Sequence, residues 1–173
     1  MKTVIIGIGN PVLTDDSVGI KVAQFIKERL KYRSNIDVCE AYAGGIVLME
    51  AMIGYERAII IDAMVTGNHI PGTVHTFMLS EISETKNLAC THNTNLSVAL
   101  EIGTILGFSL PSEIRLLGIE AKDAETFGEE LTKDVAKAVP VAAEKVFFYC
   151  GISNFNSEKA SFKFEKEVSE EAL

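Results

Sequence analysis

The first 62 residues alternate short apolar segments with amphipathic ones, and this alternation constrains the fold more than any other feature. Residues 3–8, 36–42 and 57–62 are expected to be strands, and the first and third are apolar throughout, as in a sheet buried on both faces. Helices are expected over residues 15–32, which have apolar side chains at helical spacing, and over residues 46–52. This strand–helix–strand–helix–strand order predicts a largely parallel sheet with helices on both faces.

The second half of the chain completes this sheet. Residues 73–79 alternate in polarity, and only about ten residues separate them from the preceding strand, too few for a helical crossover, so they should form an antiparallel edge strand. Residues 112–119 should form the last strand, with helices over 96–107 and 131–149; Pro140 predicts a kink or two helical pieces. The predicted fold is a three-layer α/β/α sandwich on a mostly parallel five-stranded sheet with one antiparallel strand.

Length and cysteine content indicate the domain organisation and the compartment. A chain of 173 residues suits one domain, which we expect over residues 1–152, followed by a charged tail over 153–173 that is rich in Ser, Glu and Lys. Cys39, Cys90 and Cys150 are few, odd in number and without CxxC spacing. They predict reduced thiols in a cytoplasmic protein, and the N-terminus does not resemble a signal peptide.

The charge balance argues against two classes of partner. The net charge is −8, and Lys and Arg do not cluster, which disfavours nucleic acids and anionic membrane surfaces. No apolar run approaches about 20 residues, so no membrane-spanning helix is expected.

Three side chains could meet at one edge of the sheet. Asp16, with Asp15 beside it, lies in the turn after the first strand; Asp62 ends the third strand; and His92 precedes a helix. Groups at the carboxyl ends of parallel strands converge on one crevice. Two carboxylates and an imidazole would suit a borderline divalent metal with coordination positions left open.

Other interpretations of these residues remain open. Gly7 and Gly9 could cradle a phosphate, but the third glycine of the dinucleotide motif and a Walker lysine are missing, and two carboxylates would repel the anion. Thr14 or Asp15 could simply be the N-cap of the first helix. Asp62 is harder to assign a structural role, because a carboxylate at the end of a buried strand is costly unless it is paired or coordinated.

The remaining histidines and cysteines offer weaker sites. His92 could itself be a solvated loop residue, and His69 and His75 are expected to be solvent-exposed. Cys90 could be a thiol nucleophile, although a buried, inert cysteine is the commoner case.

Four motifs in order resemble the signatures of the hydrogenase maturation proteases, the endopeptidases that trim the C-terminus of the large subunit of nickel–iron hydrogenases. The resemblance covers about residues 3 to 150. The motifs are Gly7-Ile8-Gly9-Asn10 with Asp15-Asp16 and Gly19; Ile61-Asp62-Ala63 with Gly67 and Pro71-Gly72-Thr73-Val74; His92 before a helix; and Gly118-Ile119-Glu120 with the acidic loop that follows.

The resemblance implies roles for three residues. Asp16, Asp62 and His92 fall on the family's three metal-contacting positions, so they would be both metal ligands and the catalytic residues. The metal would be nickel already installed in the substrate protein, and no organic cofactor is implied. A carboxylate acting as general base and a water activated by the metal are both compatible with these residues.

The resemblance also implies a function. The chain would be a cytoplasmic endopeptidase that removes the C-terminal extension of a nickel–iron hydrogenase large-subunit precursor after nickel insertion, acting as a monomer or weak oligomer. The alternatives are a non-catalytic nickel-binding assembly chaperone and a small-molecule hydrolase or nucleotide binder on the same fold. The peptide groove is expected to be lined by Tyr42, Gly44, Gly45, Met64 and Asn93.

Overall fold

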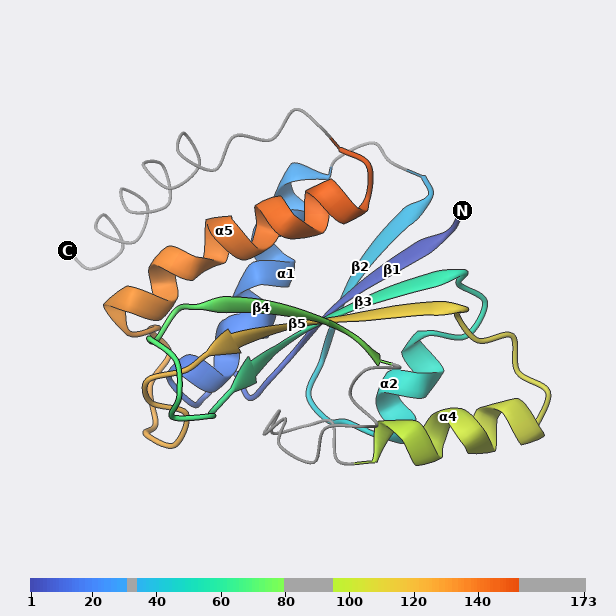
Figure 1. The fold of residues 1–173 in the computed structure, drawn as a ribbon, viewed down its shortest axis with the longest axis horizontal. Coiled ribbons are helices and arrows are strands. Elements are labelled where there is room, and N and C mark those ends of the chain that lie inside the picture. Colours follow the sequence, from blue (N-terminus) through green and yellow to red (C-terminus); the bar gives the residue numbers. More distant parts are fainter. Residues whose placement is uncertain (31–33, 80–94, 153–173) are drawn as a thin grey trace.

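A computed structural model describes residues 1–30, 34–79 and 95–152, so the predicted tail over 153–173 lies outside the described residues. The chain forms a five-stranded sheet in the order β2-β1-β3-β5-β4, in which only β4 is antiparallel to its neighbour (Figure 1). The predicted fold class is confirmed. The elements are β1 (Thr3–Ile8), the 3-10 turn η1 (Asp15–Ser17), α1 (Val18–Arg29), β2 (Ile36–Ala41), α2 (Ile46–Ala51), β3 (Arg57–Met64), β4 (Val74–Met78), α4 (Leu96–Ile105), β5 (Glu113–Glu120) and α5 (Lys133–Tyr149).

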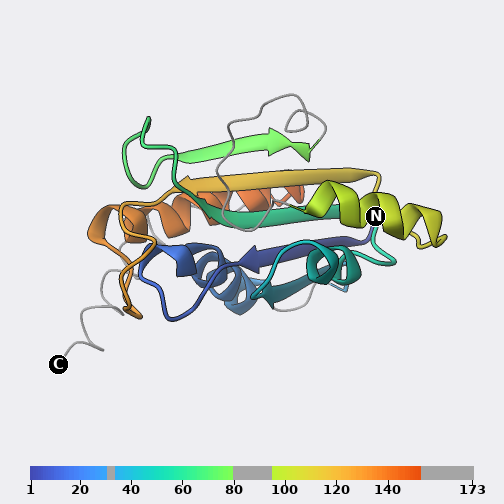
Figure 2. The ribbon, with the colours of Figure 1, turned by 90° about the horizontal axis from the view of Figure 1, so that it is seen from below.

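The helices cover the sheet in two pairs. Helices α1 and α5 pack together on one face, and α2 and α4 pack together on the other (Figures 1 and 2). Side chains alternate between the two faces along a strand. In β3, Ile59 and Ile61 belong to the core under α1 and α5, whereas Ile60 and Met64 belong to the core under α2 and α4. Asp62 lies between Ile60 and Met64 in this alternation, so its side chain is on the α2–α4 face.

Two glycines let α1 approach the sheet closely. A Cβ atom at Gly7 in β1 would collide with the carbonyl oxygen of Gly19 in α1. A Cβ atom at Gly19 would collide with the carbonyl oxygens of Ile8, the last residue of β1, and Ile61 in the second half of β3. The first turn of α1 therefore lies directly against two parallel strands, and η1 is held at their carboxyl ends.

Helix α5 differs from the sequence expectation. Of the two predicted effects of Pro140, a kink or a division into two helical pieces, the division is wrong, because Pro140 lies inside a single helix that runs from Lys133 to Tyr149. A proline in a helix interior costs about 3 kcal/mol. Pro140, Val139 and Ala143 are all buried, and this packing against the sheet offsets the cost.

His75 in β4 is partly buried, so the prediction that it is solvent-exposed is wrong, whereas His69 is exposed as predicted. The ring centroid of His75 lies 4.2 Å from that of His69 and 6.1 Å from that of Phe77. Its Nε2 atom is buried and has no hydrogen-bond partner among the described residues. Burial first, and then His69 and Lys145, lower the pKa of His75, while Glu120 opposes them.

None of the helices in residues 1–30, 34–79 and 95–152 is long and apolar enough to cross a membrane.

We predict that Gly19→Ala lowers the free energy of unfolding by about 3 kcal/mol, because the new methyl group meets two backbone oxygens that cannot move independently. Gly54→Ala is the matched control: Gly54 has φ +81° but no atom within 4 Å of a built Cβ, so the loss should be about 1 kcal/mol. Urea denaturation measures both values. Equal losses in the two variants would contradict the close approach of α1 to the sheet.

We predict that His75 makes the stability fall in mild acid. The unfolded chain takes up a proton near the ordinary histidine pKa of about 6.5, whereas the folded protein resists it because its pKa is lower. This contribution is therefore complete above about pH 6.5 and is lost as the pH falls toward the folded pKa. Urea denaturation across this range should show that the free energy of unfolding depends less on pH in His75→Gln than in the wild type. An unchanged pH dependence would refute the contribution of His75.

Candidate functional site

The turn between β1 and α1 is folded tightly upon itself. A Cβ atom at Gly9 would collide with the carbonyl oxygen of Asp16, so the backbone at the start of the turn lies directly against the backbone at its end. The backbone N–H of Asn10 donates to Oδ2 of Asp16 (2.8 Å), and the N–H of Ser17 donates to the carbonyl of Leu13 (3.2 Å). These contacts close the turn and leave η1 at the carboxyl end of the sheet.

Asp15 does not cap the helix that follows it. Its carboxylate is fully buried and accepts four hydrogen bonds, from the backbone N–H groups of Lys122 and Asp123 (both 2.9 Å) and from the N–H (2.7 Å) and hydroxyl (2.9 Å) of Thr132. All four donors come from the loop between β5 and α5, more than 100 residues away in the sequence. Asp15 therefore anchors that loop to the first turn.

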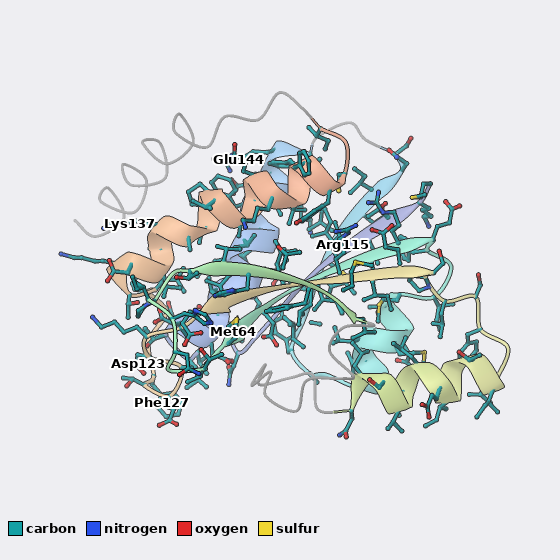
Figure 3. The ribbon with its side chains drawn as sticks, in the orientation of Figure 1. Met64, Arg115, Asp123, Phe127, Lys137 and Glu144 are labelled. Atoms are coloured by element: carbon teal, nitrogen blue, oxygen red, sulfur yellow. The ribbon has the colours of Figure 1, made fainter. Side chains whose placement is uncertain are left out.

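The other N-cap candidate, Thr14, also contacts this distant loop. Its N–H (3.0 Å) and hydroxyl (2.8 Å) both donate to the carbonyl of Thr126, and Leu13 forms a β-bridge with Phe127. Asp123 stabilises the loop from within, because its carboxylate accepts hydrogen bonds from the N–H groups of Glu125 and Thr126. Both Asp123 and Phe127 are labelled in Figure 3. The bond from the N–H of Thr126 is the main reason that the pKa of Asp123 is lowered. Thr14 occupies the N-cap position of η1, as one of the two predictions had it, but its side chain makes no capping hydrogen bond there. Asp15 is not an N-cap, and the N-cap position of α1 is Ser17.

Asp16 and Asp62 are the two predicted ligands that the structure describes. Asp16 is 2% exposed and Asp62 is fully buried. They come from neighbouring elements, since η1 contacts β3 directly. Strand β3 continues to Met64, so the prediction that Asp62 ends the strand is wrong by two residues.

The third predicted residue, His92, lies outside the described residues, as do Cys90 and Asn93. In sequence, His92 precedes the first residue of α4, Leu96, by four positions. No cluster of three His, Cys, Asp or Glu side chains within the described part of the chain could hold a metal ion. Asp16 and Asp62 supply carboxylate oxygens at this edge, and such donors are compatible with a divalent cation.

Glu120 is a further buried carboxylate at this edge, and sequence reasoning gave it no role. It is 2% exposed at the end of β5 and accepts hydrogen bonds from the N–H (3.0 Å) and hydroxyl (2.8 Å) of Thr66 and from the N–H of Gly67 (2.9 Å). It anchors the loop that follows β3. The sequence did contain a pattern that could have identified it, because Glu120 follows an apolar strand, and the same pattern singled out Asp62.

A groove of about 600 Å³ opens beside the α2–α4 layer. It includes the predicted wall residues Tyr42, Gly44 and Gly45, but Met64 is 1% exposed and is wrong as a wall residue. Sequence reasoning missed the opposite wall, because an apolar residue of a predicted helix such as 96–107 can be either buried or exposed. The groove is lined by Tyr42, Ala43, Gly44, Gly45, Ile46, Val47, Asn95, Val98, Ala99 and Ile102.

The fold and the carboxylates at the sheet edge define an α/β protein with a candidate cation-facing site. The model of the hydrogenase maturation protease family matches residues 20–149, and the chain belongs to this family.

Individual relatives agree with this assignment. The chain is 24% identical to the Hydrogenase 2 maturation protease of Escherichia coli strain K12 over 147 residues, which is 84% of this chain and 88% of that protein. Among solved structures, it resembles the [NiFe] hydrogenase maturation protease HybD from Thermococcus kodakarensis with 28% identity and a TM-score of 0.71, covering 84% of this chain and 97% of that one. The E. coli endopeptidase HybD shares the fold, with a TM-score of 0.76, 24% identity and coverage of 89% and 94%.

We predict that Asp15→Asn lowers the free energy of unfolding by about 3 kcal/mol, because an amide in this buried site cannot accept all four hydrogen bonds. Asp134→Asn is the control: Asp134 lies two residues after Thr132, but its side chain is 55% exposed and pairs with the exposed Lys137, so the loss should be about 0.5 kcal/mol or less. Urea denaturation compares the two. Similar losses would show that Asp15 is not the anchor of the loop.

Proposed function

We propose that this protein is an endopeptidase that removes the C-terminal extension of a nickel–iron hydrogenase large-subunit precursor after nickel insertion. The observation that carries the proposal is the pair of buried carboxylates, Asp16 and Asp62, on adjacent elements at one edge of the sheet in a member of this family. The names of its relatives, which include the hydrogenase expression/formation protein HupD of Rhizobium leguminosarum, support a role in hydrogenase assembly.

The three proposed ligands have the right chemistry for nickel. Carboxylate oxygens and a neutral imidazole both suit borderline divalent ions, and three protein ligands leave positions for groups of the substrate. Asp16, Asp62 and His92 would thus recognise nickel that is already held by the precursor. The ion arrives with the substrate, and we propose no organic cofactor.

Recognition of the ion would also position the peptide bond. A cation that is shared between enzyme and substrate fixes the precursor's position relative to the two carboxylates. A carboxylate that is not neutralised by the ion is then available to accept a proton from the attacking water. The same residues therefore serve both docking and hydrolysis, and cleavage should depend on nickel insertion.

We predict that Asp16→Asn, Asp62→Asn and His92→Ala each reduce cleavage of the nickel-loaded precursor by at least about a hundredfold. The fold should remain intact, as measured by circular dichroism and urea denaturation. Asp15→Asn is the matched variant one residue away: it should lose stability but keep most of its activity at low temperature, since its carboxylate faces the β5–α5 loop.

The assay is C-terminal cleavage of the purified precursor, followed by mass spectrometry, with nickel-free precursor as the control substrate. Tight binding of the nickel-loaded precursor by the wild-type protein without any cleavage would contradict the protease function and support an assembly chaperone. Full activity of Asp16→Asn together with an inactive, folded Asp15→Asn would show that the roles within the pair are reversed.

A further inference from the structure

We infer that the groove between the β2–α2 loop and α4 holds an extended, uncharged, apolar segment of the precursor, next to the cation-facing carboxylates. This inference rests on the proposed function and adds to it the chemical class of polypeptide that the enzyme binds.

The groove has a composition that is unusual for this protein. None of the ten lining residues that the structure describes is charged, although the chain carries a net charge of −8. Large apolar side chains on both walls are left exposed to solvent, at fractions between 41% and 61%. Clustered exposed apolar groups mark binding surfaces, whereas scattered ones need no explanation. These side chains are Tyr42, Ile46 and Val47 on one wall and Val98 and Ile102 on the other.

The groove is connected to the candidate site through the backbone. Its first lining residue, Tyr42, directly follows Ala41, whose carbonyl accepts from the N–H of Gly9 (3.2 Å). The next N–H along the chain, that of Asn10, donates to Asp16. Asp62 lies on the sheet face that α2 and α4 cover, the same side from which the groove is built. A chain bound at the carboxylates can therefore continue into the groove.

The shape of the groove suits an extended main chain. Its lining includes Gly44 and Gly45, which have no side chains to obstruct an approaching backbone, and Gly45 has φ +60°. This part of the lining continues from β2, an edge strand of the sheet, and extended peptides commonly bind beside such edges. A volume of about 600 Å³ lies within the range of sites that hold small ligands or short peptide segments.

Both walls are held in place by the fold. Helices α2 and α4 pack closely at Gly103, where a built Cβ would lie 3.0 Å from Sδ of Met49. The hydroxyl of Tyr42 donates to the carboxylate of Glu40 (2.9 Å), which fixes the ring beside the groove. Because the walls are preformed, binding would cost little ordering of the enzyme.

The absence of charge from the lining residues also identifies the kind of occupant. An anion such as a nucleotide would find no basic side chain among them, and a charged peptide would lose its hydration without gaining a partner. Apolar side chains of an extended segment would instead cover the exposed walls.

The test is a pair of substitutions from opposite walls, Val98→Asp and Val47→Asp, assayed for cleavage of the nickel-loaded precursor. Each should raise KM by about tenfold and leave kcat nearly unchanged, because the carboxylate would be desolvated in the bound complex but plays no part in the chemistry. Ile105→Asp is the matched control: Ile105 is on α4 and 83% exposed but does not line the groove, so its KM should stay at the wild-type value.

Wild-type KM in both Val98→Asp and Val47→Asp would overturn the inference, as would equal effects in Ile105→Asp. Val98 and Val47 are already exposed, so both variants should fold, and circular dichroism is the check. If sedimentation shows that the substitutions only dissociate a dimer, the occupant is a second copy of this chain and the inference is wrong.

A direct binding measurement separates this inference from the proposed function. Fluorescence anisotropy of a labelled synthetic peptide that covers the precursor's C-terminal extension needs no cleavage. Wild-type binding that Val98→Asp weakens by about tenfold supports the groove even if no hydrolysis is seen. If the wild type cleaves the precursor but the wild type and Val98→Asp bind the peptide equally well, the role of the groove is refuted and the protease function is unaffected.

Discussion

The buried carboxylate of Asp15 is the interaction on which the geometry of the sheet edge depends. Its four hydrogen bonds join the turn after β1 to the loop before α5, and so tie together the segments that lead into the two helices of one layer, α1 and α5. A buried carboxylate is tolerated only when its oxygens are fully hydrogen-bonded, and here backbone N–H groups and Thr132 meet that requirement. The neighbouring Asp16 is thereby held in a turn that cannot move independently of the rest of the fold.

The two adjacent aspartates thus have different physical roles. Asp15 faces the β5–α5 loop, whereas Asp16 bonds within its own turn, beside the end of β3. The close approach of Gly19 to Ile8 and Ile61 sets this position, because it removes the space that would otherwise separate η1 from the strands. Asp16 and Asp62, the two proposed ligands that the structure describes, are therefore carried by elements packed against the sheet, which is what precise positioning of a substrate requires.

Much of this architecture could be predicted from local patterns in the sequence. Continuous apolar strands and a short connection to residues 73–79 were enough for the parallel sheet and its antiparallel edge, and both were confirmed. The carboxylates near the ends of apolar strands were expected to lie close together, and the structure does place Asp16 and Asp62 on neighbouring elements. Hydrogen bonds between distant segments could not be predicted, and so Asp15 and Glu120 received no anchoring role.

The remaining errors have a related cause. Helical periodicity identifies apolar residues but does not tell which of them are buried, and Ile46, in the predicted helix over residues 46–52, is 54% exposed in the groove wall. Likewise, the local preference of Pro140 to break a helix was overridden by the packing of α5 against the sheet. The groove became visible only when the β2–α2 loop and α4 were placed in space.

The most direct test of the central claim is a crystal structure of the protein with nickel bound, alone or with the precursor. Carboxylate oxygens of Asp16 and Asp62 and a ring nitrogen of His92 should each lie about 2.0–2.2 Å from a single ion. An ion bound elsewhere on the protein would contradict the account. So would ligand atoms of these three residues more than about 7 Å apart, since no single ion could then bridge them at such bond lengths.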